Sequence, residues 1–250
     1  MLNRLCYPCP VCAHDSRPFD VVDFNKSCLE QHGTALPLSG EPVYYFFCPT
    51  CGFTFAPELC AWPWEIFERK IYNEDYAAVD PSFRMKRPHQ NHEILTGLFS
   101  KSKGRIRHLD FGGGNGFLSK LLKESGWDTQ SYDPVLDKGV RPEDLGQFDL
   151  VTAFEVFEHV PDVNELMGRL KALLKPSGLI YFSTMLSDRD IVPGKRLTWW
   201  YVAPRNGHIS LFSMKSLAVL AGKFDLNYKP QDNRAHFLWS SLPDWAAGVV

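Results

Sequence analysis

A run of glycines that follows a carboxylate constrains the fold of this chain more than any other feature. Asp110-Phe-Gly-Gly-Gly-Asn-Gly116 spaces three of its glycines as G-x-G-x-G. The segment Ile106-Arg-His-Leu109 before it is typical of a short buried strand, and apolar residues recur at helical spacing from Phe117 to Leu122. Glycines let the backbone approach a ligand closely, and a helix N-terminus offers unpaired N–H groups. The run therefore predicts a strand, a ligand-binding loop and a helix.

The same run could also belong to a dinucleotide-binding fold, whose fingerprint is G-x-G-x-x-G. The third glycine of that fingerprint would stand at position 117, but this chain has Phe117 there and its third spaced glycine is Gly116. The spacing disfavours a pyrophosphate ligand. A dinucleotide-dependent oxidoreductase is therefore the less favoured alternative.

Further strands and helices follow the glycine run in alternation. Asp133 stands seventeen residues after Gly116 at the end of an expected strand. In nucleotide-binding α/β folds this position holds ribose hydroxyls. Segment 148–154 predicts another buried strand, residues 161–174 predict a helix with one apolar face, and a strand is expected at 179–182. This order favours a parallel sheet with helices on both faces.

Four ordered motifs in this region resemble those of class I S-adenosylmethionine (SAM)-dependent methyltransferases. They are the glycine run, F-D-L-V at 148–151, E-V-F-E-H-V-P-D at 155–162 and L-K-P-S-G at 174–178. The resemblance covers residues 106–239. It implies an α/β fold with a doubly wound, seven-stranded, mostly parallel Rossmann-like sheet, closed by an antiparallel pair near 226–228 and 236–239. It also implies SAM as the cofactor and methyl transfer to oxygen, nitrogen or carbon of an acceptor.

The resemblance also implies where the cofactor binds. Asp110 would face the methionine end of SAM. Gly112, Gly114 and Gly116 would lie under the cofactor, and Asp133 would bind its ribose.

Contacts to the adenine and to the SAM carboxylate are left open. The stretch after the second carboxylate is short and poor in strand-forming residues, where the family usually has a third strand. Asp144, Val140 and the ring of Phe154 are alternative adenine contacts. Residues just before the first strand often meet the SAM carboxylate in related enzymes, which makes Tyr76 and Arg84 candidates. The alternative for these two is core packing beside a solvated arginine.

Two histidines are candidates for removing a proton from the methyl acceptor, because imidazole titrates near neutral pH. His159 follows Glu155-Val-Phe-Glu158 at a strand end, and His208 lies in the long segment 183–212. Glu158 or Glu155 would orient the imidazole. The alternative for both histidines is a structural, hydrogen-bonded role.

The E-x-x-E-H spacing would place Glu155, Glu158 and His159 on one side of a helical turn. Similar sequences bind a divalent cation in ubiquinone-biosynthesis O-methyltransferases and in small-RNA 2′-O-methyltransferases. The resemblance thus makes a divalent cation one alternative here, with His208 as a fourth ligand. Many relatives carry the motif without metal; there Glu155 would touch the surroundings of the cofactor and His159 would orient backbone or substrate.

Four of the seven cysteines form two C-x-x-C pairs, Cys9/Cys12 and Cys48/Cys51. Each pair can point two thiolates at one tetrahedral ion, so structural zinc in a reducing compartment fits better than disulfides. The 35 residues between the pairs exceed the usual spacing. The longer loop costs only about 0.7 kcal/mol, against about 10 kcal/mol or more from a structural zinc ion. Cys6 could replace Cys9 or Cys12, and buried free thiols are the alternative to metal.

We expect the 250 residues to divide into a zinc-ribbon-like module at 1–60, a helical lid or linker at 61–104 and a methyltransferase domain at 105–250. A net charge of −2 disfavours nucleic acid and anionic membranes as partners. No apolar run is long enough to span a membrane. The sequence thus predicts a cytoplasmic enzyme with a small-molecule acceptor. The alternative is a zinc-ribbon adaptor that keeps the fold without the chemistry.

Overall fold

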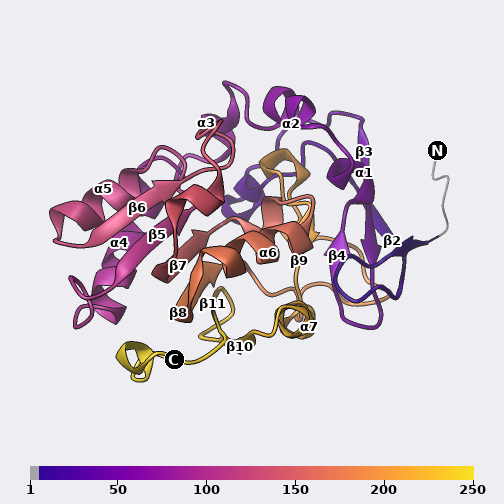
Figure 1. Ribbon diagram of the computed structural model, residues 1–250. Coiled ribbons are helices and arrows are strands. Elements are labelled where there is room, and N and C mark those ends of the chain that lie inside the picture. The colour runs from indigo at the N-terminus through magenta and orange to yellow at the C-terminus, as the bar shows by residue number, and fades with distance from the viewer. Residues whose placement is uncertain (1–5) are drawn as a thin grey trace. The chain divides into compact units, whose positions relative to one another are not determined.

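The computed structural model describes residues 6–250, which form two compact units (Figure 1). The first unit holds the described residues up to Pro81, with Phe157–Asn164 and Met185–Leu220. The second unit holds Ser82–Val156, Glu165–Thr184 and Ala221–Val250. These two units are defined by contacts and each contains several separate segments of the chain. They do not test the domain boundaries expected at residues 60 and 104, which stay predictions.

A six-stranded sheet in the order β10-β11-β8-β7-β5-β6 forms the centre of the second unit (Figure 1). Its strands are β5 (Arg107–Phe111), β6 (Asp128–Tyr132), β7 (Phe148–Phe154), β8 (Leu174–Ser183), β10 (Asn227–Pro230) and β11 (Ala235–Trp239). The strands β6, β5, β7 and β8 run parallel, whereas β11 and β10 pair antiparallel at one side. This arrangement confirms the doubly wound, mostly parallel α/β fold and its antiparallel closure.

The expected seventh strand is absent from residues 6–250. Between β6 and β7 the chain forms the 3₁₀ helix η2 (Pro142–Leu145) instead. Two prolines and two glycines interrupt this stretch, and both glycines have positive φ. Such a stretch lacks the alternating apolar residues that would bury a strand. The sheet therefore ends at β6 on this side.

Helices cover the sheet of the second unit. They are α4 (Lys86–Leu98), α5 (Phe117–Glu124), α6 (Val163–Leu173) and the 3₁₀ helix η5 (Asp244–Ala246). The helix α5 begins after Gly116 and buries Leu118 and Leu122, as its helical spacing predicts. These leucines join Leu150 and Tyr181 in one hydrophobic core.

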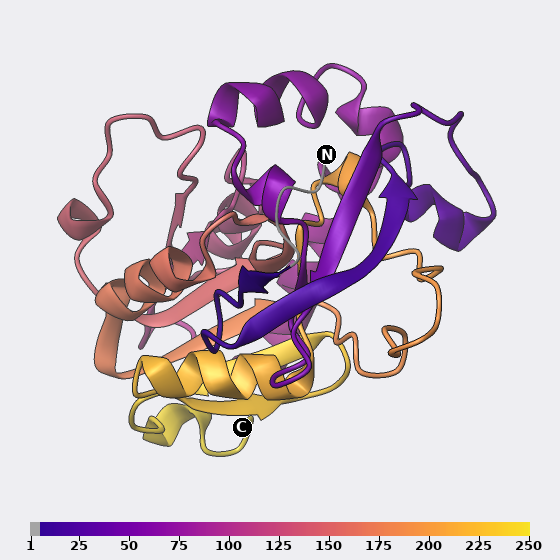
Figure 2. The same ribbon diagram turned by 90° about the vertical axis from the view of Figure 1, so that its right-hand side faces the viewer.

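The first unit contains a five-stranded antiparallel sheet in the order β1-β2-β3-β4-β9. Its strands are β1 (Tyr7–Pro8), β2 (Asp15–Asp23), β3 (Pro42–Phe47), β4 (Thr54–Phe55) and β9 (Ser210–Leu211). Figure 2 shows β2 and β3 side by side. The strand β9 comes from a distant part of the chain and pairs with β4. The N-terminal strands therefore share one sheet with the long segment after β8.

Short helices complete the first unit. They are η1 (Cys28–His32), α1 (Pro57–Cys60), α2 (Trp64–Lys70), α3 (Tyr76–Val79), η3 (Phe157–His159) and η4 (Pro204–Asn206), and α7 (Met214–Lys223) begins here. Ser213 caps α7, because its Oγ accepts the Ser216 N–H at 3.0 Å. The core combines Tyr45 and Phe67 with Tyr201. No helix within residues 6–250 is both long and apolar enough to cross a bilayer.

Candidate functional site

The glycine run lies where β5 ends and α5 begins. Gly112, Gly114 and Gly116 have φ angles of 71°, 55° and 73°, in the left-handed region that glycine tolerates. The Gly112 N–H donates to the Tyr132 carbonyl at 2.8 Å, and the Gly114 N–H donates to Asp133 Oδ2 at 3.0 Å. The loop is thereby fixed between the carboxyl ends of two adjacent parallel strands, where α/β sheets bind ligands.

Gly113 is the most tightly packed residue of this loop, and the spacing of the motif does not single it out. A Cβ atom at Gly113 would lie 2.3 Å from Ser131 Oγ and 2.5 Å from Asp110 Oδ2. Cβ atoms do not lie that close to other atoms, so any larger residue here would force Ser131 or Asp110 to move. The signal in the sequence is the third glycine in direct succession, which the G-x-G-x-G pattern ignores.

Asp110 is a buried carboxylate at the end of β5. Burial raises its pKa to about 7, a hydrogen bond from Thr152 Oγ1 at 3.0 Å acts against this, and nearby Asp133 adds to the rise. Burial also lowers the pKa of His108 to about 3, so this imidazole is neutral. When Asp110 is ionised, Thr152 donates to it and accepts from His108 Nε2 at 3.0 Å. A cationic ligand near Asp110 would favour its charged form.

Asp133 is oriented by three backbone donors. Its Oδ1 accepts from the N–H groups of Val135 at 2.9 Å and Leu136 at 3.2 Å, and its Oδ2 accepts from Gly114 at 3.0 Å. A carboxylate offers about four lone-pair positions. The structure therefore holds the Asp133 side chain in one direction and leaves acceptor capacity for a ligand hydroxyl.

Glu155 follows β7 in the second unit and has a φ of 53°, which is uncommon for a residue with a side chain. Its N–H donates to Ser183 Oγ at 2.9 Å, and this hydroxyl donates back to Glu155 Oε1 at 2.8 Å. Arg234 Nη2 lies 3.3 Å from the same oxygen. The expectation of one helical turn for E-x-x-E-H is wrong, because the left-handed backbone at Glu155 precedes η3, which begins at Phe157.

Glu158, His159 and His208 come together in the first unit, with their ligand-capable atoms all within 4.8 Å of one another. The ring centroids of the two histidines are 4.9 Å apart. Of the four ligands in the divalent-cation alternative, three come together, whereas Glu155 binds Ser183 and Arg234 in the second unit.

Tyrosines hold this cluster in place. The Tyr201 hydroxyl donates to Glu158 Oε1 at 2.6 Å. His208 Nδ1 donates to the Tyr201 carbonyl at 2.8 Å, which places the lone pair of a neutral imidazole on Nε2. The Tyr72 hydroxyl lies 3.3 Å from His159 Nδ1. Sequence reasoning gave these tyrosines no hydrogen-bonding role, because nothing in their spacing indicates such distant partners.

The turn at η4 brings His208 to this position. Arg205 Nη1 donates to the Ile71 carbonyl at 3.0 Å, and the Tyr45 hydroxyl donates to the His208 carbonyl at 2.7 Å. Gly207 follows with a φ of 91°, and a Cβ atom there would lie 3.1 Å from His159 Nδ1. Glycine at this position therefore leaves room for the second histidine.

The two C-x-x-C pairs also converge in the first unit. The Sγ atoms of Cys9 and Cys51 are 3.6 Å apart, those of Cys12 and Cys48 are 3.4 Å apart, and all four lie within 4.8 Å of one another. A zinc ion at about 2.3 Å from each of four sulfurs requires sulfurs about 3.8 Å apart. The cysteine cluster therefore fits tetrahedral zinc. Cys6 is exposed and lies outside the cluster.

Both pairs adopt the same turn. The residue after the second cysteine has a positive φ in each case, 63° at Ala13 and 79° at Gly52. Ala13 N–H donates to the Cys9 carbonyl at 2.9 Å, and Gly52 N–H donates to the Cys48 carbonyl at 2.8 Å. The hydrogen bond between Cys9 and Cys51 lowers the pKa of Cys9 and raises that of Cys51, so the two thiols share one proton and one of them is the thiolate that zinc binds.

The remaining candidates for SAM contacts make packing and surface contacts. Tyr76 packs edge-on against Tyr72 in the first unit, with ring centroids 5.1 Å apart. The guanidinium of Arg84 lies over the ring of Phe83 in the second unit. Phe154 packs edge-on against Tyr181, while Asp144 forms an exposed ion pair with Arg141 and Val140 is exposed. Roles for these residues in SAM binding stay predictions.

Comparisons with known proteins agree with the fold. A family profile described as "Methyltransferase domain" matches residues 83–231. The ubiquinone biosynthesis O-methyltransferase of Bordetella avium (strain 197N) is 34% identical over a region that covers 37% of this chain and 48% of that protein. The chain thus spans about half the length of this curated relative.

Two solved structures from Burkholderia thailandensis share the fold. An O-methyltransferase family protein has a TM-score of 0.50 at 15% identity and covers 72% of this chain and 63% of its own. The other is 1,6-didemethyltoxoflavin-N1-methyltransferase, solved with 1,6-didemethyltoxoflavin and S-adenosylhomocysteine. It has a TM-score of 0.50 at 16% identity and covers 80% of this chain and 94% of its own. With the profile match over most of the second unit's sheet, the chain belongs to the methyltransferase domain family.

Proposed function

We propose that this chain is a SAM-dependent methyltransferase that acts on a small-molecule acceptor. One observation carries the proposal: the glycine loop 112–116 is fixed between Asp110 and Asp133 at the carboxyl ends of adjacent parallel strands. A Cβ atom at Gly114 would meet nothing within 4 Å, so the backbone there is open to a ligand, and a carboxylate stands on either side of the loop.

Charge favours a sulfonium nucleoside over a diphosphate at this loop. Two carboxylates that bracket the loop repel phosphate oxygens but attract the sulfonium and ammonium groups of SAM. Asp110, whose pKa lies near 7, gains most from such a cation because the cation stabilises its ionised form. Asp133 offers acceptor capacity for the ribose hydroxyls. A dinucleotide would bring negative charge to the same place.

SAM, when bound, supplies an activated methyl group, and the chain must hold the acceptor and remove its proton. We assign proton removal to the cluster of Glu158, His159 and His208. His208 is the favoured base, because its Nδ1–H is committed to the Tyr201 carbonyl and its lone pair lies on Nε2. Glu158 and Tyr201 would hold the imidazoles in place.

Binding of a divalent cation is a second role that we propose for the same cluster. Two imidazoles and one carboxylate form a donor set that binds divalent metals with open coordination positions. The cation would then polarise an acceptor hydroxyl. Turnover assays without and with added Mg²⁺ or Mn²⁺, on protein that retains its zinc, distinguish the two roles; a rate that does not depend on the added metal leaves only proton removal.

The cysteine cluster, in turn, is proposed to hold structural zinc, since its four sulfurs fit the tetrahedral geometry. Cysteine thiols stay available for metal only in a reducing compartment. This supports a cytoplasmic site of action.

Calorimetric titration tests the proposed function. We expect SAM and S-adenosylhomocysteine to bind and NAD not to bind. Asp133→Asn should weaken SAM about 10- to 100-fold, because it removes a charged acceptor. Asp128→Asn, an exposed change at the opposite end of the same strand, is the matched control. Binding of NAD in place of SAM would support the oxidoreductase, and binding of neither would leave the adaptor.

A further inference from the structure

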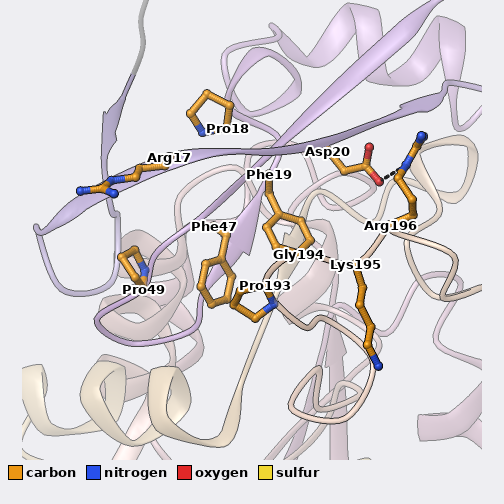
Figure 3. Close-up of a pocket in the computed structure, with 10 residues that line it drawn as sticks. All are labelled: Arg17, Pro18, Phe19, Asp20, Phe47, Pro49, Pro193, Gly194, Lys195 and Arg196. Atoms are coloured by element: carbon orange, nitrogen blue, oxygen red, sulfur yellow. Dashed lines mark hydrogen bonds and ion pairs between the residues drawn. The ribbon is translucent and has the colours of Figure 1, made fainter.

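A groove of about 420 Å³ in the first unit lies outside all the sites described so far (Figure 3). It runs between β2, the loop of the second cysteine pair and the segment 193–196. Phe19, Phe47 and Pro193 turn their rings toward the same space in Figure 3. The groove therefore has an apolar floor on the unit's surface.

A β-bulge places Phe19 in this floor. The pairing of β2 with β3 shifts register between Pro18 and Asp20, so Phe19 has no partner residue across the ladder. Bulges change the direction in which a side chain points and are found next to functional sites. The Phe19 ring lies against Phe47, with centroids 5.4 Å apart. The two rings thus form a continuous aromatic surface.

An ion pair between the largely buried Asp20 and the exposed Arg196 fixes the opposite wall. Asp20 Oδ2 accepts from Arg196 Nε at 2.8 Å and from the Leu197 N–H at 2.7 Å. Burial alone would raise the pKa of Asp20, but hydrogen bonds from Leu197, Val21 and Arg196 lower it below its ordinary value. The one carboxylate of the groove is therefore already neutralised, and it ties segment 193–196 to β2.

The cations that remain have no acidic partner. Across residues 6–250, no carboxylate lies within ion-pair distance of Arg17 or Lys195. The Arg196 side chain is 76% exposed, whereas that of Asp20 is 10% exposed, so the arginine projects beyond its pair. Figure 3 shows Arg17 at one end of the groove, with Lys195 and Arg196 toward the other. The groove is thus basic in a chain whose net charge is −2.

We propose that this groove binds an extended acidic peptide segment of a partner protein. An apolar side chain of the peptide packs on Phe19, Phe47 and Pro193. Its flanking carboxylates pair with Arg17 at one end and with Lys195 at the other. Charge complementarity of this kind governs partner choice and the association rate, and the aromatic floor supplies the apolar contact that short peptides need.

Other occupants fit the groove less well. Nucleic acids bind by neutralising many phosphates, and this groove offers two unpaired cations. Small ligands are enclosed over most of their surface, whereas this groove is partly open to solvent. The peptide would bring a partner protein to the enzyme and leave methyl transfer itself unchanged.

Selection from a phage-displayed library of random dodecapeptides on the full-length protein tests the proposal. We expect enrichment of peptides in which Asp or Glu flanks Leu, Phe or Trp. The enriched peptide, made with a fluorescein label, should bind about tenfold more weakly to Lys195→Glu and to Arg17→Glu, which corresponds to about 1.4 kcal/mol. Phe19→Ala should weaken it as well, and salt should weaken it further.

Lys101→Glu, which reverses an exposed charge in the second unit, is the matched control and should bind as the unchanged protein does. SAM titration of every variant shows whether the protein is folded, and SAM affinity should not change. The proposal is overturned if no acidic peptide is enriched, or if binding survives both charge reversals. It is also overturned if anionic vesicles or an RNA oligonucleotide bind more tightly with the same residue dependence. Failure of peptide binding with normal SAM binding leaves the proposed function intact.

Discussion

The glycine loop and the cluster of Glu158, His159 and His208 are built in opposite ways. The loop and its two carboxylates come from residues 110–133, a single stretch of strand, turn, helix and strand. The cluster draws its supports from far along the chain, since Tyr201 and Glu158 are 43 residues apart and Tyr72 and His159 are 87 apart. The first kind of site depends on local backbone geometry, whereas the second depends on the folding of a whole unit.

Loss of zinc should affect the two sites most differently. Cys48→Ser should release one equivalent of zinc and destabilise the first unit by about 10 kcal/mol. Because the cluster depends on that unit, turnover should be lost, while SAM affinity falls much less. Metal analysis, near-ultraviolet circular dichroism and SAM titration measure these three effects. A variant that is stable without metal would contradict the zinc proposal.

The buried carboxylate of the glycine loop should make the unliganded protein sensitive to pH. The pKa of Asp110 is about 7 in the folded protein against an ordinary value of 3.8. Between pH 4 and pH 7 the Asp110 carboxyl is therefore protonated in the folded state and ionised in the unfolded state. The free energy of unfolding falls as pH rises from about 4 to 7. Full ionisation costs about 4 kcal/mol.

Asp110→Asn removes this cost, so its melting temperature should exceed that of the unchanged protein at pH 8, and the difference should shrink toward pH 4. Thermal melts across this pH range measure it. If the melting temperatures of both proteins change equally with pH, the pH dependence comes from a group other than Asp110.

A change in the local backbone should harm only the loop. Gly113→Ala would push a methyl group against Ser131 and Asp110, so SAM affinity should fall about 100-fold, or about 2.7 kcal/mol. Gly97→Ala, where a Cβ atom meets nothing within 4 Å, is the control. Calorimetry with SAM makes the measurement, and an unchanged affinity would show that the cofactor does not contact this loop.

The smallest effect should come from one hydroxyl of the cluster. Tyr201→Phe removes the donor to Glu158, so turnover should fall about tenfold, or about 1.4 kcal/mol, with SAM affinity unchanged. Tyr44→Phe, on β3, serves as the control. Steady-state kinetics and SAM titration separate the two readouts. If SAM affinity falls together with turnover, the two sites are not independent in the way described here.

The difference between a site built from local backbone geometry and one built from long-range contacts also explains how much could be predicted from the sequence. The strands β5, β6 and β7 and the convergence of Cys9, Cys12, Cys48 and Cys51 follow from short patterns, because hydrophobic periodicity and turn-forming residues act over a few positions. The missing third strand is also visible as a proline- and glycine-rich stretch.

Long-range partners could not be predicted in this way. The hydrogen bond from Tyr45 to the His208 carbonyl joins residues 163 positions apart, and no local pattern encodes it. The helical turn expected at Glu155 is wrong, because a positive φ in a residue with a side chain cannot be recognised from the spacing of the motif. Gly113 was passed over because a pattern of spaced glycines does not show which of them is closely packed.

The strand β9 limits how this protein can be shortened. Its two residues, Ser210 and Leu211, complete a sheet whose other strands come from the cysteine-bearing N-terminal part. Deletion of either portion would expose the hydrogen-bonding edge and the core of the other. A shortened form of the first unit must therefore keep both segments.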